Sequence, residues 1–475
     1  MLVTVLPFIE TVVANTSNFL WTYVLSILLI CTGLYLTVQL RFFQFRFFGH
    51  ILGQTVGKIF KKSSGHAGTI TPFQAFTSAL ASTAGATNIV GVPVAISFGG
   101  PGALFWMWVV ALIGMATKYT EIVLGVRYRE KNKKGEWVGG PQYYIKKGLG
   151  WNKVAWAFAF ILMLELIPSI MTQSNSISIQ VNNSIGWSRL GIGVAIAVVV
   201  GAIIIGGIQR IARVTDKFVP FMVFTYVIIC LIVIFAHVET LPSVFGLIFS
   251  HAFTPIAATG GFAGAALAQA LRWGTARGLY SNEAGLGTAP IAHAAAQTDH
   301  PSKQGFWGVF SVFVDTIVIC TLSGLTVLVT GAWKEVSSDD AASMIGTALS
   351  DVYGSQFGET FVSIFLLFFV LTTIGILVFF GEKQAEYLFG LKGAYFMRVI
   401  YLGAIVLGAV GGLQFIWQFL DLMLAAVVFL NVIPVLFLSK EVRAVTQDYV
   451  NRIYKQKKDT KKIDLFHESD KDFRS

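Results

Sequence analysis

The chain has 475 residues, of which 55% are hydrophobic and only 13% are charged. Because soluble globular proteins are about 25% charged, this composition excludes a soluble domain, a disordered chain and a small secreted disulfide scaffold. A nucleic-acid binder is excluded as well, but the formal net charge of +10 suggests an anionic partner of some kind. The positions of the basic residues therefore decide what the charge means.

Eleven stretches are apolar enough and long enough to cross a bilayer, which takes about 20 helical residues. In chain order they span about 19–40, 72–98, 102–124, 154–180, 189–208, 217–237, 252–271, 305–330, 361–380, 395–412 and 415–438. The sequence therefore predicts an all-α polytopic membrane protein with about 11 transmembrane helices.

The basic residues orient these helices. With the N-terminus outside, 32 of the 35 Lys and Arg residues fall on the inner side, in the loops at about 41–71, 125–153, 209–217, 272–304 and 381–394, at loop edges, and in the tail from 439. Inner loops of membrane proteins carry such an excess. We therefore expect a multi-pass protein of the cell membrane with a cytoplasmic C-terminus. The lipid bilayer is then the partner for the positive charge, and no nucleic acid is needed.

Two of the eleven segments are rich in Gly, Ala, Ser and Thr instead of Leu and Phe. The segment at 72–98 contains Gly85, Thr87, Asn88 and Gly91, and the segment at 252–271 contains Gly260, Gly261, Phe262 and Gly264. Close packing of small residues between helices is one explanation. We favour the other, in which both helices are interrupted near the middle of the membrane.

Position supports this interpretation. If the first span is an extra helix, the two weak segments become helices 1 and 6 of a ten-helix core and begin on opposite sides of the membrane. The chain then divides into 1–71 (outer N-terminus, extra helix and inner loop), 72–238 (first five-helix repeat), 239–438 (second, inverted five-helix repeat) and 439–475 (cytoplasmic charged tail). Paired interruptions of this kind indicate the binding site of a secondary transporter, where free amides bind a carboxylate and free carbonyls bind Na⁺ or an ammonium group.

Several motifs resemble one family. Residues Gly99–Gly114 read GGPGALFWMWVVALIG, Ser281–Ala296 read SNEAGLGTAPIAHAAA, and Phe313–Thr321 read FVDTIVICT. They are similar to the prokaryotic alanine or glycine:cation symporters, the sodium:alanine symporter family of the amino acid-polyamine-cation superfamily. The resemblance implies a leucine-transporter-type core. It also implies Na⁺-coupled, less often H⁺-coupled, uptake of a small neutral amino acid in a prokaryotic cell membrane, with co-transported sodium and no organic cofactor.

The same resemblance implies the site residues. The candidates for substrate binding are Gly85, Thr87, Asn88, Gly91, Gln173, Gly260, Gly261, Phe262, Gly264 and Leu377, and those for sodium are Gly85, Asn88, Thr372 and Thr373. For Gln173 the alternative is an interhelical contact, and for the threonines it is a bond to their own helix.

The sequence departs from the family pattern at two places in this pocket. Ala86 and Thr87 replace the Thr-Gly of the family's Gly-Thr-Gly-Asn, and Leu377 stands where the family often has Trp. The loss of a Trp leaves room for a larger substrate such as glutamine.

Charged groups inside the membrane are costly and often functional. Glu165 and Asp315 are therefore candidates for coupling or gating, with a buried structural role as the alternative. Glu283 lies in the SNEAG stretch on the inner side and is a candidate for a cytoplasmic gate with Arg272 or Arg277. We expect Lys118 and Glu121 to form an ion pair near the inner end of their helix, with both side chains snorkelling toward the membrane surface. Asp421 and Asn431 are expected to bond between helices.

Other function classes fit less well. The sequence has no HExxH, paired-cysteine or GxSxG motif of an enzyme. A channel remains the main alternative class, because glycine-interrupted helices also line pores, although the sequence has no selectivity-filter repeat. The identity of the amino acid, its chirality, the coupling ion and the oligomeric state stay open.

Overall fold

The structure, a computed structural model, describes residues 12–13, 15–17, 19–59, 67–85, 87–253, 263–337, 341, 343–411 and 414–455. Almost all of these residues are helical, and a two-stranded antiparallel hairpin is formed by β1 (Glu130–Lys131) and β2 (Trp137–Val138), with Glu130 opposite Val138.

The first half of the chain forms helices η1 (Leu20–Leu25), α2 (Ser26–Gln39), α3 (Phe43–Arg46), α4 (Phe48–Gln54), η2 (Val56–Lys58), α5 (Pro72–Thr83), η3 (Thr87–Gly91), α6 (Val92–Gly99), α7 (Gly102–Arg127), α8 (Pro141–Leu149), α9 (Asn152–Ile185), α10 (Arg189–Ile204), α11 (Gly207–Ala236) and η4 (Val238–Thr240). The second half forms α12 (Leu241–Phe253), α13 (Ala263–Asn282), α14 (Ala289–His293), α15 (Pro301–Val312), η5 (Phe313–Cys320), α16 (Thr321–Val329), α17 (Ala332–Glu335), α18 (Met344–Tyr353), α19 (Ser355–Val410), α20 (Gln414–Phe437), α21 (Ser439–Asp448) and η7 (Tyr449–Tyr454).

The helices are those of a membrane protein. Within the described ranges, seven are long and apolar enough to cross a bilayer, or eight if the bent pair α5 and η3–α6 counts as one span. Large apolar side chains point outward where lipid would lie, and Ile205, Phe224 and Val399 are 71%, 66% and 69% exposed. The predicted all-α polytopic class is confirmed, whereas the count of eleven spans stays a prediction.

Two predicted spans lie on α19, which consists of two helices joined at a kink. The segments at 361–380 and 395–412 are the two arms of α19, which turns at Gly390 with a φ of 73°. Glycine adopts this left-handed conformation without the steric cost that a side chain would impose. The arm at 361–380 brings its threonines toward the middle of the bundle, beside α5.

The predicted interruption of the weak segment at 72–98 is present. Thr71 caps α5 with a capping box shared with Gln74, and the helix ends at Thr83 because Ala84 is extended, with a ψ of 106°. The chain becomes helical again at Thr87, and the two halves are bent by 47°.

The weak segment predicted at 252–271 differs. Helix α13 begins at Ala263 and continues to Asn282, so the residues from 272 on are helical where an inner loop was expected. Gly260, Gly261 and Phe262 lie outside the described residues, and Gly264 lies in the first turn of α13. The helix then stops, and Glu283, Gly285 and Gly287 have φ values of 53°, 106° and 75° before α14 begins.

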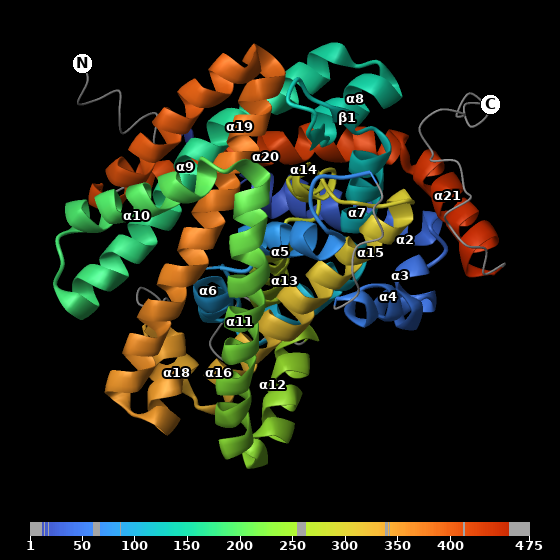
Figure 1. The fold of residues 1–475 in the computed structure, drawn as a ribbon. Helices are drawn as coiled ribbons and strands as arrows, with labels where there is room; N and C mark the ends of the chain where they lie inside the picture. The colour runs from blue at the N-terminus through green and yellow to red at the C-terminus, as the bar shows by residue number, and fades with distance from the viewer. Residues whose placement is uncertain are drawn as a thin grey trace.

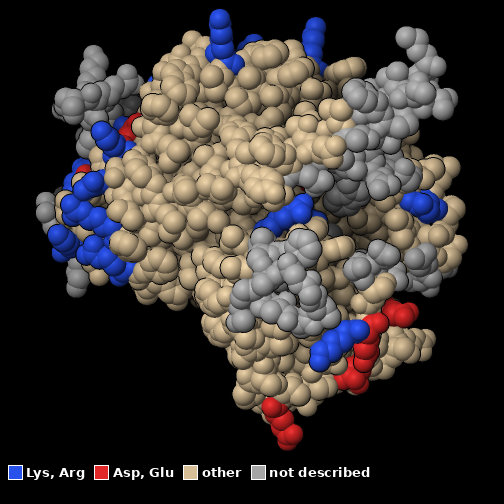
Figure 2. Space-filling view, turned by 180° about the vertical axis from the view of Figure 1, so that it is seen from behind, with Lys and Arg blue, Asp and Glu red and all other residues tan. Residues whose placement is uncertain are grey.

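The two ends of the bundle differ in charge. Helix α8 and the β hairpin lie at one end, and α12 and α18 lie at the opposite end (Figure 1). Basic side chains dominate the upper part and one edge of the surface, and the acidic side chains of the lower end lie beneath them (Figure 2). We call the end with the β hairpin the inner end, following the predicted charge bias. The orientation of the termini itself stays a prediction.

Candidate functional site

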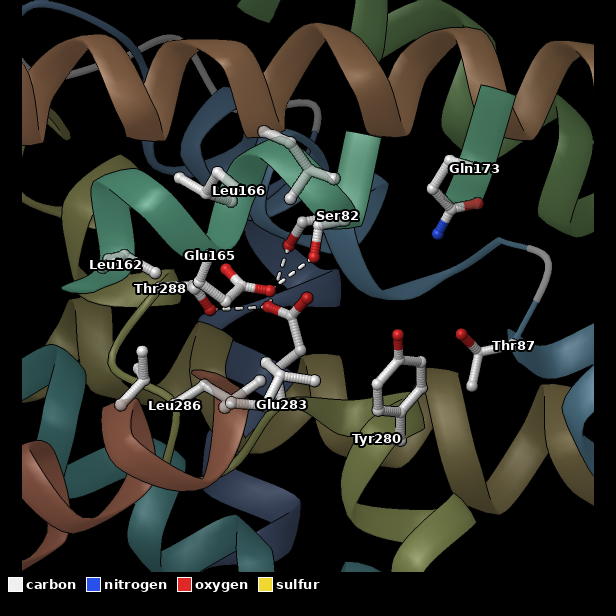
Figure 3. Close-up of a pocket in the computed structure, with 14 residues that line it drawn as sticks. Ser82, Thr87, Leu162, Glu165, Leu166, Gln173, Tyr280, Glu283, Leu286 and Thr288 are labelled. Carbon is white, nitrogen blue, oxygen red and sulfur yellow. Dashed lines mark hydrogen bonds between the residues drawn. The ribbon is translucent and has the colours of Figure 1, made fainter. Parts of the chain in front are cut away.

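A cavity lies at the centre of the helical bundle, where the two interrupted segments meet. It encloses about 510 Å³ of space, part of it open to solvent. Its wall comes from α5, η3, α9, α13, the 283–288 segment, α19 and α20, through Ser82, Thr87, Leu162, Glu165, Leu166, Ser169, Gln173, Tyr280, Glu283, Leu286, Thr288, Leu377, Leu424 and Val427 (Figure 3). Five of the residues predicted from sequence are therefore brought together: Thr87, Glu165, Gln173, Glu283 and Leu377.

The break in helix 1 of the predicted core lies between α5 and η3, and a side-chain amide forms a hydrogen bond across it. The carbonyl oxygen Oδ1 of Asn88 accepts a hydrogen bond from the backbone N–H of Gly85 over 3.1 Å. This bond replaces one that a continuous helix would make, because the extended Ala84 interrupts the backbone ladder. The break therefore leaves backbone polar groups beside the cavity.

Helix α19 reaches the same break. The hydroxyl of Thr373 donates to the carbonyl oxygen of Ala81 over 2.7 Å. A Cβ atom on Gly85 would lie 3.2 Å from the same hydroxyl oxygen. The hydroxyl of Thr372 instead bonds to carbonyls of its own helix, those of Phe368 at 3.2 Å and Phe369 at 2.9 Å.

Asn88 also ties the break to two other helices. Its amide nitrogen Nδ2 lies 2.9 Å from Oδ1 of Asp315 and 3.2 Å from Oγ of Ser281. The hydroxyl of Ser281 donates to Oδ2 of Asp315 over 2.5 Å, and that of Thr316 donates to the same oxygen over 3.0 Å. All four side chains are buried. Asn88 and Asp315, both predicted site residues, thus form a buried polar cluster behind the cavity wall.

The interruption after α13 is set by side chains from two other helices. Oε1 of Glu121 accepts from the N–H groups of Gly285 and Gly287, both over 3.1 Å, and from Nδ2 of Asn431 over 2.5 Å. Nζ of Lys118 donates to the carbonyl oxygen of Asn282 over 2.8 Å. Lys118 and Glu121 are 1% and 0% exposed. The expected snorkelling at the inner end is therefore wrong, since both side chains are buried and hold the unwound backbone.

Glu283 projects from this interruption into the cavity (Figure 3). Its Oε2 accepts from the hydroxyl of Thr288 over 2.6 Å and from that of Ser82 over 3.1 Å. The bond to Ser82 connects the unwound segment directly to α5. The carboxylate therefore links the two interrupted helices at the wall of the cavity.

Helix α9 supplies the opposite wall. Glu165 is 2% exposed and accepts a hydrogen bond from the hydroxyl of Ser169. Two turns farther along, the Oε1 atom of Gln173 is buried without a hydrogen-bond partner. An unpartnered buried oxygen is costly, so Gln173 is suited to bond a ligand in the cavity.

The comparisons with known proteins agree with this architecture. A model of the sodium:alanine symporter family matches residues 6–464. The chain belongs to the sodium:alanine symporter family.

Three curated relatives align with this chain over nearly their whole lengths. An uncharacterized transporter, YflA, of Bacillus subtilis is 50% identical over 92% of this chain and 93% of its own. The sodium/alanine symporter AgcS of Methanococcus maripaludis is 38% identical over 92% and 97%. The probable sodium/glutamine symporter GlnT of Bacillus subtilis is 36% identical over 94% and 91%.

A solved structure shares the fold. MhsT, crystallised in complex with L-phenylalanine, matches with a TM-score of 0.56 at 12% identity, over 81% of this chain and 99% of that one. At this identity the likeness concerns the fold alone. The expected leucine-transporter-type fold is confirmed, and the chain is a multi-pass membrane transport protein.

Several residues that line the central cavity of this family member were not predicted from the sequence. Tyr280, Ser82 and Thr288 were not singled out, and the interruption at 283–288 was not predicted. The interruption expected near Gly260 lies outside the described residues and stays a prediction. The sequence signal for the interruption at 283–288 is the pair of closely spaced glycines in SNEAGLG, Gly285 and Gly287, which adopt positive φ values. Gly91 packs against Thr87 in η3, since a Cβ at Gly91 would lie 3.3 Å from Cγ2 of Thr87.

Proposed function

We propose that the protein is a sodium-coupled symporter that imports a small neutral amino acid by alternating access. The observation that carries the proposal is the approach of Thr373 to the break in helix 1, one wall away from a central cavity. This arrangement offers oxygen atoms to a cation and backbone amides to an anion within one site. The names of the relatives AgcS and GlnT support sodium as the coupling ion.

The sodium ion would bind between helices α5 and α19. Its ligands would be the carbonyl oxygens of Gly85 and Asn88 together with the hydroxyls of Thr372 and Thr373. Hard cations prefer such oxygen ligands. The Gly85 carbonyl accepts from the backbone N–H of Asn88 over 3.2 Å and would have to exchange this bond for the ion. To serve as ligands, both hydroxyls would exchange the carbonyl partners that they have here for the ion.

The amino acid would occupy the central cavity. The helix 1 break would offer amides to its carboxylate, and Thr87 and Gln173 would supply further hydrogen bonds from the wall. Alanine and glycine are the candidates that the family suggests. Glutamine is the larger candidate, because Leu377 lines the cavity where the family often has Trp, and because the relative GlnT is named for it.

Alternating access requires that the inner end open. At that end the guanidinium of Arg129 donates to the carbonyl oxygens of Ala294, Ala296 and Ala67 over 3.0, 2.6 and 3.0 Å. Residues 67–70 and 295–297 also pair through their backbones, and Gln297 N–H donates to the Ile70 carbonyl over 2.8 Å. These bonds connect the segment that precedes α5 to the segment that follows α14. Their rupture would release both helices toward the cytoplasm.

A proton-coupled symporter is the second candidate. Glu165 and Glu283 line the same cavity from α9 and from the unwound segment, and their carboxyl groups interact electrostatically. Two carboxylates in one buried site favour sharing a proton. The cavity could therefore carry a proton inward with the amino acid.

Uptake into proteoliposomes tests the proposal. Labelled alanine, glycine and glutamine would each be offered with an inward Na⁺ gradient, with an inward H⁺ gradient in choline medium, and with neither. The sodium proposal expects accumulation only with Na⁺, further increased by an inside-negative potential because one inward charge gains about 2.3 kcal/mol per 100 mV. Accumulation driven equally by H⁺ in choline contradicts sodium coupling. A channel would show no trans-stimulated exchange in counterflow.

A further inference from the structure

A second cavity adjoins the central one. It encloses about 520 Å³, part of it open to solvent, and is lined by Ser17, Trp21, Arg272, Trp273, Ala276, Arg277, Tyr280 and Asp421. Tyr280 lines both cavities. In the central cavity its hydroxyl points between Thr87 and Gln173 (Figure 3). A single aromatic side chain therefore stands between the two spaces.

One side of this second cavity is formed by a single face of α13. Trp273, Arg277 and Tyr280 are separated by four and three residues, which places them on the same face of a helix. The guanidinium of Arg277 lies 5.4 Å from the ring centre of Trp273 and 5.9 Å from that of Tyr280. The two rings hold the guanidinium in place and leave its N–H donors available.

Arg277 and Asp421 carry opposite charges at this cavity and do not pair with each other. They interact electrostatically, yet within the part of the chain that the structure describes no salt bridge joins them, and Nε of Arg277 is buried without a hydrogen-bond partner. The hydrogen bond of 3.0 Å from Trp21 to residue 421 uses the backbone carbonyl, so it leaves the Asp421 carboxylate free for a ligand. The cavity thus has a separated cation and anion on its wall.

We propose that this second cavity is a docking site for an α-amino acid zwitterion on its way to the central site. The guanidinium of Arg277 would bind the carboxylate of the amino acid, since arginine forms paired hydrogen bonds with carboxylates. Asp421 would bind the ammonium group. Movement of Tyr280 would then admit the docked molecule to the central cavity.

Equilibrium binding with the purified full-length protein tests the proposal. The probe is radiolabelled L-alanine, glycine or L-glutamine, whichever the wild type binds most tightly, measured in Na⁺ and in choline medium. In the second cavity both charges that would bind the amino acid belong to the protein, so this cavity is expected to bind without Na⁺. The wild type should then bind two molecules in Na⁺ and one in choline. Arg277→Gln should bind one in Na⁺ and none in choline, and Asp421→Asn should behave in the same way.

Matched variants separate the charge from the substitution. Arg213→Gln replaces an exposed arginine that, among the described residues, bonds to its own helix at the Gln209 carbonyl, and it should bind as the wild type does. Arg277→Lys keeps the charge but loses the fork geometry, so its choline-medium affinity should fall about tenfold. Propionate and methylamine each carry one of the two charges, and neither should displace the choline-medium label.

Two results would overturn the proposal: no binding to the wild type in choline, or unchanged stoichiometry in Arg277→Gln. The outcome does not depend on the coupling ion. If the sodium proposal fails and both sites bind without Na⁺, Arg277→Gln is still expected to lose one of the two molecules.

Discussion

The hydroxyl of Thr373 in α19 donates a hydrogen bond of 2.7 Å to the carbonyl oxygen of Ala81 in α5. This contact joins residues that are 292 positions apart in the chain and lies beside the break that follows Thr83. It brings together the arm of α19 that carries the threonines and the interrupted helix.

Replacement of Thr373 by alanine should therefore weaken sodium coupling. We expect the Na⁺ concentration for half-maximal uptake to rise about tenfold or more, because one oxygen ligand is lost. Thr373→Ser keeps the hydroxyl and should stay near the wild type. Thr372→Ala tests whether a hydroxyl that bonds to its own helix also serves the ion. An unchanged half-saturation in Thr373→Ala would contradict the assignment.

Leu377→Trp should restrict the substrate. The indole would fill part of the central cavity, so glutamine uptake should fall about tenfold or more while glycine uptake stays within about threefold. The measurement is the ratio of kcat/KM for the two amino acids. Leu424→Met changes the wall with little change of volume and serves as the control. Equal losses for both substrates would show that Leu377 does not set the size of the pocket.

Glu165→Gln separates the two coupling schemes. If Glu165 carries a proton, this variant should lose the pH dependence of uptake while still binding the amino acid. If sodium alone drives transport, the Na⁺ dependence and the pH profile of Glu165→Gln should both match the wild type. Ser169→Ala removes the hydrogen-bond donor to Glu165 without removing the carboxyl group, so it is the matched control.

Glu121→Gln should loosen the interruption after α13. A glutamine has one acceptor oxygen and no charge, whereas Glu121 accepts three hydrogen bonds at one oxygen. Each buried charged hydrogen bond contributes about 1.5–3 kcal/mol, so the apparent Tm in detergent should fall by several degrees and transport should be lost. Glu239→Gln changes an exposed carboxylate and should leave both the Tm and transport unchanged. A wild-type Tm and wild-type uptake in Glu121→Gln would contradict this anchoring role.

A pH effect is expected at the inner end. Burial of Glu136 opposes ionisation, but the ammonium of Lys383, with hydrogen bonds from Lys383 and Asn132, outweighs it and lowers the pKa of Glu136 below its ordinary value of 4.5. A lowered pKa stabilises the fold above the unfolded-state value, and the gain is lost as the pH falls through the folded-state pKa. The apparent Tm should therefore fall on acidification below about pH 4.5, and Lys383→Gln should reduce this acid sensitivity. Lys392→Gln is the control.

The sequence alone determined the class of the protein and predicted one of the two interruptions that border the candidate site. Few charges and long apolar runs require a bilayer, and the motifs indicate the family. The break in helix 1 could be predicted because its cause is local: Gly85 and Asn88 weaken the helix and supply the bond that replaces its backbone ladder.

Only the tertiary structure showed that the chain is unwound at 283–288 and what faces the cavity. The interruption at 283–288 depends on Lys118, Glu121 and Asn431, which come from α7 and α20 and bond to the unwound backbone. From the sequence, the positive charge of Arg277 indicates a loop. In the structure Arg277 lies within α13, with its guanidinium beside the rings of Trp273 and Tyr280. Partners so distant in the chain leave no local pattern, because hydrogen bonds and packing across helices depend on the assembled bundle.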